Sequence, residues 1–483
     1  MNTLQRLLSN TILAFIANTI AKVSSSILFI FIGRVIGPEE AGIFNLGVTY
    51  YAILLALSTL GLHELLVREV APQREKSGRY LTNYIIMRLV SSTALYLGLL
   101  LFLQLSLPYS AETESVLRIM SLAIFPEAIF SLCQALFIAH ERQAAPTVSA
   151  LLNAAVRLGL GLYLLQQGAG AVTVAWVMPI STTIGLLVFP PALISLARRA
   201  PQSEAARFDY RFSLQQLHMT SGFVLLELFQ TLNFQADTFI LSIMMTEADI
   251  GYYGASQTIL AGVLMIPVAI RMALYPLMAR VSSENGSKLR YLYHKAGQYA
   301  LMIGIPMAAG VTILAAPMVE LLFGLDFGPA IPALQISVWS IVFDLATVPN
   351  ARLMLIKGRQ TPASWLRGIG TVASVGLNLL LIPRFGINGA ALARVLATAI
   401  FSLAIYFYVQ RNLLKDSLLP LVIRPLLATV GMAIAVWWLR DGSLIISTMA
   451  GIVVYGILIV VLGGVTEEDR AYFRQLWVFK PET

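Results

Sequence analysis

Residues 11–36 read TILAFIANTIAKVSSSILFIFIGRVI, an almost wholly apolar run with Lys22 near its middle. A helix needs roughly 20 apolar residues to cross the hydrocarbon core of a bilayer, and this run is long enough. A cation at that depth costs about 3 to more than 10 kcal/mol, and such residues usually face a polar cavity. The run therefore predicts a transmembrane helix whose lysine serves the transport of something negative.

Similar apolar runs recur along the chain, which has 483 residues, 58% of them hydrophobic and 12% charged. Blocks of about 20 residues predict an all-α polytopic membrane protein with about fourteen transmembrane helices. The first run is too long for the core of a signal peptide, so we expect it to be retained. The predicted spans are 10–36, 41–67, 80–106, 116–139, 144–166, 171–196, 213–245, 249–279, 289–323, 330–356, 362–382, 387–410, 418–439 and 444–464.

Basic residues concentrate in alternate connections, such as 68–79 and 198–211, whereas connections such as 38–40 and 110–114 are acidic. Basic loops face the cytoplasm, so both termini are expected there, in the cytoplasmic membrane of a bacterium or archaeon. This pattern also explains the net charge of +8 without nucleic acid. The short connections leave no room for a catalytic domain, and Cys133 is the only cysteine, so neither an enzyme nor a metal site or cofactor is expected.

Two segments look like an internal repeat: residues 38–45 (PEEAGIFN) and residues 246–253 (TEADIGYY). Aligning Gly42 with Gly251 gives an offset of 209 residues, from 251 minus 42. An even number of spans separates them, which predicts two pseudo-symmetric six-helix lobes around a central cavity. The expected domains are a first lobe at 1–199, a cytoplasmic linker at 200–212, a second lobe at 213–412, two additional helices at 413–466 and a cytoplasmic tail at 467–483.

Polar residues in the first and eighth spans are the main candidates for binding an anion. Asn18, Lys22 and Ser25 project within about 60° of one another on a helix and would form one wall of the cavity. The alternative is that Lys22 pairs with a carboxylate of a neighbouring helix. Arg271 follows Pro267, whose ring invites a kink, and either lines the cavity or extends toward the cytoplasmic surface.

The seventh span carries Glu227, Gln230, Asn233 and Asp237 within about 120° of arc. This face would bind a coupling ion, Na⁺ or H⁺, or contact sugar hydroxyls, or would instead neutralise the cations.

Four further charges lie within apolar spans. Arg88 and Arg157 are candidates for binding phosphate, with Arg157 one turn from Asn153, and Glu127 and Asp344 are candidates for ion coupling. Opposite signs also make structural pairs plausible.

Several motifs, in order along the chain, resemble the polysaccharide flippases of the multidrug, oligosaccharidyl-lipid and polysaccharide exporter superfamily: residues 33–44 (GRVIGPEEAGIF), 236–241 (ADTFIL), 321–324 (LLFG) and 386–391 (GINGAA). The resemblance implies two six-helix lobes, two extra C-terminal helices, and flipping of a polyprenyl-diphosphate-linked oligosaccharide to the outer leaflet by alternating access. The chain also resembles, more distantly, the flippase for the lipid-linked peptidoglycan precursor, which implies that Lys22 and Arg271 hold the diphosphate. Lysine rather than arginine on the first helix is a departure, since lysine makes no bidentate contact with phosphate.

The expected function is therefore that of a flippase, acting as a monomer among membrane lipids and alongside a polysaccharide polymerase and glycosyltransferases. An ion-coupled drug or metabolite antiporter of the same fold is the alternative. An exporter of organic cations should have an acidic cavity and usually stops at twelve helices, so Lys22, Arg157, Arg271 and the two extra spans argue against it. A membrane glycosyltransferase would need a larger outer loop than the sequence offers.

Overall fold

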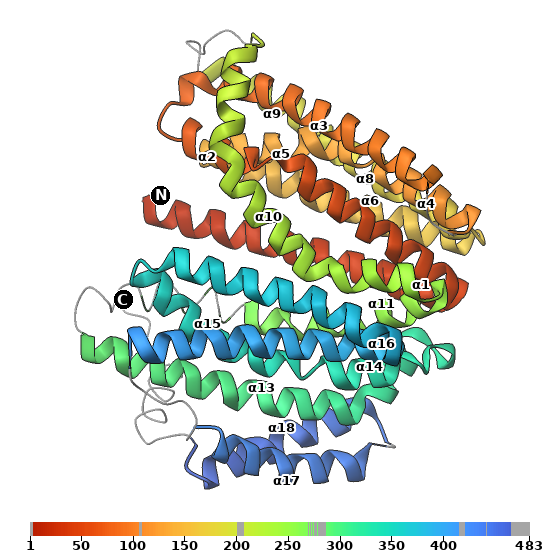
Figure 1. Ribbon diagram of the computed structural model, residues 1–483, viewed down its shortest axis with the longest axis vertical. Coiled ribbons are helices and arrows are strands. Elements are labelled where there is room, and N and C mark those ends of the chain that lie inside the picture. The colour runs from red at the N-terminus through yellow and green to blue at the C-terminus, as the bar shows by residue number, and fades with distance from the viewer. Residues whose placement is uncertain are drawn as a thin grey trace, which may run out of the picture. The chain divides into compact units, whose positions relative to one another are not determined.

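The computed structural model describes residues 3–105, 109–199, 207–268, 286–414, 421–440 and 442–464, together with residues 270, 272, 274 and 278. All regular secondary structure in these segments is helical (Figure 1). The chain forms two compact units. Unit 1 comprises Met1–Thr258 with Ile382–Ile387, and unit 2 comprises Ile259–Leu381 with Asn388–Thr483.

Unit 1 contains α1 (Thr3–Thr59), α2 (Leu62–Val70), η1 (Arg74–Lys76), α3 (Ser77–Leu105), α4 (Ala111–Ser121), α5 (Ile124–Ala139), α6 (Ala144–Gln166), α7 (Ala171–Ala175), α8 (Val177–Leu186), α9 (Phe189–Arg199), α10 (Tyr210–Met244) and most of α11 (Glu247–Val263). Unit 2 contains α13 (Gly286–Phe323), η2 (Leu325–Phe327), α14 (Ala330–Ser337), α15 (Ser340–Ile356), most of α16 (Gln360–Asn412), α17 (Ile423–Leu439) and α18 (Leu444–Val461).

The fourteen predicted spans have counterparts among the described helices. Nine helical stretches in the described segments are long and apolar enough to cross a membrane. Two of these, Thr19–Thr59 and Gln360–Asn412, each contain a backbone break and so supply two spans. With α10, α11 and the shorter apolar helix α17, they account for fourteen. The predicted all-α, multi-pass membrane fold is confirmed.

The boundary between the first two spans is a break inside α1 rather than a loop. Gly37 has φ 88° and ψ 177°, in the region that side-chain-bearing L residues rarely adopt. Pro38 follows and has no N–H to donate to the preceding turn. The helix therefore stops at one residue and resumes at the next, and α16 has a similar break at Gly386.

Within unit 1, α1 packs against α4, α6 and α10, and α3 packs against α5. An apolar core gathers residues from α2, α3, α5 and α9, including Phe130 and Phe189, whose rings meet edge-on with centroids 5.5 Å apart. Cys133 lies in this core and is 2% exposed, so it serves as a small buried hydrophobe. Within unit 2, α13 packs against α15 and α17, and α17 packs against α18 (Figure 1).

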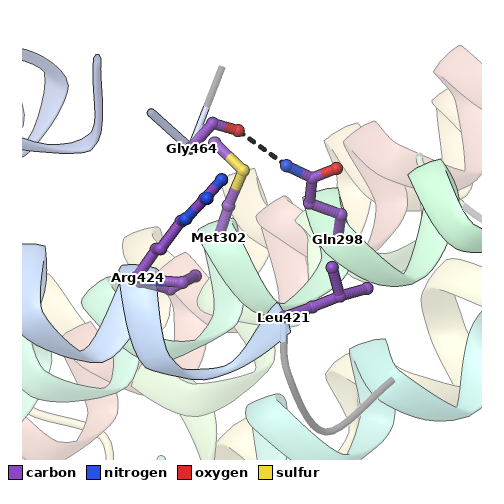
Figure 2. Close-up of a pocket in the computed structure, with 6 residues that line it drawn as sticks. Gln298, Met302, Leu421, Arg424 and Gly464 are labelled. Carbon is purple, nitrogen blue, oxygen red and sulfur yellow. Dashed lines mark hydrogen bonds between the residues drawn. The ribbon is translucent and has the colours of Figure 1, made fainter. Parts of the chain in front are cut away.

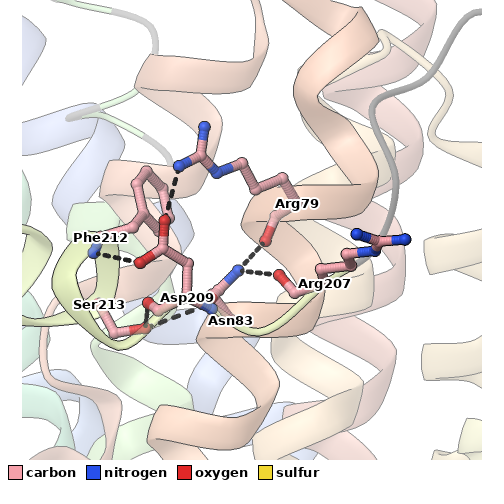
Figure 3. Close-up of polar contacts among 6 residues, drawn as sticks. All are labelled: Arg79, Asn83, Arg207, Asp209, Phe212 and Ser213. Carbon is pink, nitrogen blue, oxygen red and sulfur yellow. Dashed lines mark hydrogen bonds and ion pairs between the residues drawn. The ribbon is translucent and has the colours of Figure 1, made fainter.

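A cluster of polar contacts fastens the start of α10 to α3 (Figure 3). Asp209 caps α10 by accepting from the Phe212 N–H at 3.1 Å, and its other oxygen pairs with Arg79 at 2.9 Å. The fully buried Asn83 donates to the Arg207 carbonyl at 3.0 Å and accepts from the Asp209 N–H at 2.8 Å. The Phe212 N–H and the Arg79 guanidinium hold the pKa of the exposed Asp209 carboxyl below its usual range. We call this cluster the Asp209 junction.

Candidate substrate-binding face

Lys22 lies on α1 with an exposed side chain. Its ammonium makes no hydrogen bond or ion pair with any other residue that the structure describes. Ser25 follows three residues later and therefore lies on the same side of the helix. Among the described residues, the alternative in which a carboxylate of a neighbouring helix neutralises Lys22 finds no partner, so this cation is available for an anion.

Arg157 on α6 joins the face that Ser25 begins. Its Nη1 donates to the Ser25 hydroxyl oxygen and its Nη2 to the Asn153 amide oxygen, each at 3.3 Å. The Ser25 hydroxyl donates its own proton to the Ala21 carbonyl at 3.0 Å, which leaves its oxygen free to accept from the guanidinium. The packing of α1 on α6 thus places a predicted phosphate ligand beside the predicted polar stripe. We call Lys22, Ser25, Asn153 and Arg157 the cationic face.

Arg88 on α3 has a different environment, because its side chain is fully buried. Its Nη1 donates to the Ser131 hydroxyl of α5, while Nε and Nη2 have no hydrogen-bond partner among the described residues. A buried guanidinium with unmet N–H groups is costly, so a functional reason is expected for keeping it. In this conformation the Arg88 side chain is not accessible to a substrate. Direct contact between Arg88 and a substrate would require α3 and α5 to move apart.

Glu127 on α5 interacts electrostatically with both Arg88 and Arg157. Among the described residues it forms no ion pair with either, so its charge acts on both guanidinium groups at longer range. Tyr51 of α1, which is 9% exposed, also lies within the range of these three charges. Sequence reasoning missed Tyr51 and Ser131. Ser131 could have been found from the sequence, because it follows Glu127 by four residues and so lies on the same side of α5.

The predicted polar face of the seventh span lies on α10, where its members have different surroundings. Asp237 is 5% exposed, and its carboxylate accepts from the Tyr253 hydroxyl at 2.5 Å and from the Thr238 N–H at 2.8 Å. It thereby links α10 to α11. Glu227 and Asn233 are half-buried and Gln230 is exposed, so these three remain accessible to a ligand.

Three further predicted site residues, Arg271, Asn18 and Asp344, add nothing to the cationic face. Arg271 lies outside the described residues, as does the side chain of Asn18. Asp344 lies half-buried on α15 of unit 2. The cationic face therefore consists of residues from α1 and α6, whereas Arg88 is buried on α3 and Glu127 is half-buried on α5.

Two family profiles match the chain. The family described as "Polysaccharide biosynthesis protein" matches residues 7–282, and the family "Lipid II flippase MurJ" matches residues 205–463. The probable low-salt glycan biosynthesis flippase Agl15 of Haloferax volcanii is 21% identical over 392 residues, which cover 81% of each chain. Lipid II flippase MurJ of Bacillus subtilis is 25% identical over 487 residues, covering 89% of this chain and 88% of the relative.

Solved structures share the fold. Lipid II flippase MurJ in an inward closed conformation superposes with a TM-score of 0.75 at 15% identity, covering 97% of this chain and 100% of that one. An inward-facing multidrug transporter of the MATE family gives a TM-score of 0.65 at 17% identity, covering 83% and 95%. Since each profile spans more than half of the 483 residues, the chain belongs to the polysaccharide biosynthesis protein and lipid II flippase families of the multidrug, oligosaccharidyl-lipid and polysaccharide exporter superfamily, which are transporters and not enzymes.

Proposed function

We propose that this protein flips a polyprenyl-diphosphate-linked oligosaccharide, the repeat unit of a polysaccharide, from the inner to the outer leaflet of the cytoplasmic membrane by alternating access. The two family matches support a lipid-linked glycan as the substrate class. Two relatives are named as flippases, one probable and for low-salt glycan biosynthesis, the other for lipid II. In this proposal both termini are cytoplasmic, the lobes are residues 1–199 and 213–412, and the polymerase and glycosyltransferases act as partners.

The observation that carries the proposal is the cationic face. A diphosphate needs cations that are not already neutralised, and Lys22 makes no ion pair with any described residue. Within the described part of the chain, Arg157 makes two long hydrogen bonds, both to neutral oxygens, and a phosphate oxygen would be a stronger acceptor for the same N–H groups. Lys22 and Arg157 would therefore grip the diphosphate, while Gln230 and Asn233 would contact sugar hydroxyls. Arg271 is assigned to the diphosphate by the family resemblance alone.

A close helix contact supports alternating access. In unit 1, a Cβ added to Gly42 would lie 1.7 Å from the Glu247 carbonyl oxygen, and one added to Gly251 would lie 1.9 Å from the Pro38 carbonyl oxygen. Pro38 and Glu247 are 209 residues apart, the same offset as Gly42 and Gly251. Each contact is thus the image of the other, as expected at a pseudo-twofold axis between repeats. Such a contact can close one side of a transporter and must separate when that side opens.

The test uses the full chain in liposomes that contain a polyprenyl-diphosphate oligosaccharide, with the fraction of glycan exposed to an external lectin followed over time. Lys22→Ala and Arg157→Ala should each slow flipping by about 10- to 100-fold, because a charge-assisted hydrogen bond contributes about 1.5–3 kcal/mol. Arg118→Ala is the matched control, since Arg118 forms an exposed pair with Glu114 at 2.7 Å on α4. Unchanged flipping in both test variants would refute the diphosphate site. A wild-type protein that moves organic cations but no glycan would establish the antiporter instead.

A further inference from the structure

Three helices of unit 2 meet where α18 ends. The last turn of α18 closes with the Gly464 N–H donating to the Ile459 carbonyl at 2.8 Å and the Gly463 N–H donating to the Val460 carbonyl at 3.1 Å. Gly463 has φ 67°, the left-handed conformation that this type of helix ending requires and that glycine adopts without strain. The chain therefore turns sharply away from α18 and leaves the carbonyls of Gly463 and Gly464 for other partners.

Side chains of the other two helices donate hydrogen bonds to these carbonyls. Arg424 on α17 donates from Nη1 to the Gly463 carbonyl at 2.6 Å, and Gln298 on α13 donates to the Gly464 carbonyl at 2.6 Å. Figure 2 shows both side chains reaching toward this stretch of chain from separate helices. Between them lies a pocket of about 220 Å³ lined by Gln298, Met302, Leu421, Arg424, Pro425 and Gly464.

The pocket combines an apolar floor with a cationic rim. Met302 is 9% exposed and Pro425 is buried, and both belong to the floor. Arg424 is exposed, and its guanidinium forms no ion pair with any carboxylate in the described segments. Only Nη1 is engaged there by a hydrogen bond, so further N–H groups of this side chain remain available to an anion.

The surroundings of the pocket are those of a lipid-facing surface. Ile423 and Leu427, on either side of Arg424 along α17, are 61% and 54% exposed. Val461, at the end of α18, is 74% exposed. This pocket has one cation that no described carboxylate compensates, and it lies at the ends of two membrane-spanning helices. Its charge and position are those of the basic pockets that bind lipid head groups.

Size decides which lipid fits. Sites for drug-sized molecules usually enclose about 300–1,000 Å³, so a pocket of about 220 Å³ is too small for a diphosphate that carries an oligosaccharide. A single phosphate with its glycerol fits. We propose that this pocket binds the phosphate of an anionic phospholipid of the surrounding bilayer, whose acyl chains lie along the exposed apolar faces of α17 and α18.

This bound lipid has a structural consequence. Arg424 and Gln298 already tie α17 and α13 to the end of α18, and a phosphate on Arg424 would neutralise the charge that this side chain brings to the lining of the pocket. The lipid would then hold the two C-terminal helices against α13 without being transported. The site is separate from the cationic face, which is built from residues of unit 1.

The experiment compares phosphatidylglycerol with phosphatidylcholine as probes for the full chain. The purified protein is incubated with equal amounts of each lipid, and retained lipid is measured by native mass spectrometry. Wild type should retain phosphatidylglycerol about fivefold more strongly, because one arginine near an anionic head group contributes about 1 kcal/mol. Arg424→Gln removes the charge and should abolish the preference, whereas Arg424→Lys should keep it.

Arg440→Gln is the matched control, because Arg440 follows the other end of α17, where it stacks on Trp437 at 3.7 Å. It should leave the preference unchanged, and so should Lys22→Ala, which separates this site from the flipping site. Equal retention of the two lipids by wild type would overturn the proposal, even if Arg424→Gln does not fold. Equal losses in Arg424→Gln and Arg440→Gln would also overturn it. Displacement of phosphatidylglycerol by polyprenyl diphosphate would assign the pocket to the transported lipid instead.

Discussion

Replacing Gly42 with alanine should damage both stability and transport. The added Cβ would lie 1.7 Å from the Glu247 carbonyl oxygen and 2.9 Å from the Gly251 nitrogen, both of them backbone atoms that no rotamer change can move. Ordinary carbon–oxygen contacts lie above about 3 Å, so α1 and α11 must separate by more than about 1 Å at this point. Overpacking of this kind costs about 1–3 kcal/mol, and it opposes the gain of up to about 1 kcal/mol that alanine brings to a helix.

Gly98→Ala on α3 is the matched control, because a Cβ there meets nothing within 4 Å and should be neutral or slightly stabilising. Because the gain in helix propensity is common to both variants, they should differ by the overpacking cost alone, about 1–3 kcal/mol in unfolding free energy. Thermal unfolding of the purified protein measures this difference, and the liposome assay measures transport. Equal stability and equal flipping of the two variants would refute the idea that this crossing must close tightly.

Three further predictions concern charged residues of unit 1. Arg88→Met should leave the unfolding temperature unchanged or raise it, because an apolar side chain of similar volume replaces a buried charge with unmet N–H groups. Flipping should fall in the same variant. A large loss of stability would instead assign Arg88 a structural role. The pKa of Asp209 is lowered by the Phe212 N–H and by Arg79, so its contribution to stability should be complete above about pH 4 and be lost as the pH falls through the folded-state pKa; acid unfolding of Asp209→Asn should lack this component. Glu127→Gln should reduce the dependence of flipping on pH or Na⁺, and an unchanged dependence would remove Glu127 from the coupling mechanism.

The sequence predicts the transmembrane helices well because their signals are local. The predicted span 144–166 has the bounds of α6, since an apolar run ends between polar residues on both sides. Breaks within spans were missed: the predicted span 116–139 is α4 and α5, and the predicted span 171–196 is α7, α8 and α9. Each interruption lies two or three residues before a proline, which has no N–H to donate to the preceding turn: Pro126, Pro179 and Pro190. Proline, rather than hydropathy, was therefore the available local signal. Neither the periodicity nor the length of an apolar run encodes them.

The candidate site was only partly predictable, because some of its contacts join residues that lie far apart in the sequence. The contact between Asn153 and Arg157 follows from their spacing of one helical turn, and the structure confirms it. The contact between Arg157 and Ser25 joins residues 132 positions apart, which no periodicity could pair. Asp237 shows the same limit. Its position on α10 suggested a role toward a cation or coupling ion, whereas its hydrogen-bond partner Tyr253 lies on another helix.

In the mechanism that we propose, electrostatic interactions among the charges of unit 1 connect substrate binding to ion binding. Arg157 donates to Ser25 on the cationic face and interacts electrostatically with the half-buried Glu127 of α5. When a diphosphate engages Arg157, less of its charge remains to compensate the Glu127 carboxylate, so binding of a proton or cation at Glu127 becomes more favourable. By linkage, an ion at Glu127 must then favour the diphosphate to the same extent. Arg88 is the second cation that interacts electrostatically with this carboxylate. Its Nε and Nη2 groups have no hydrogen-bond partner among the described residues, so they can interact with Glu127 when Arg157 binds the substrate.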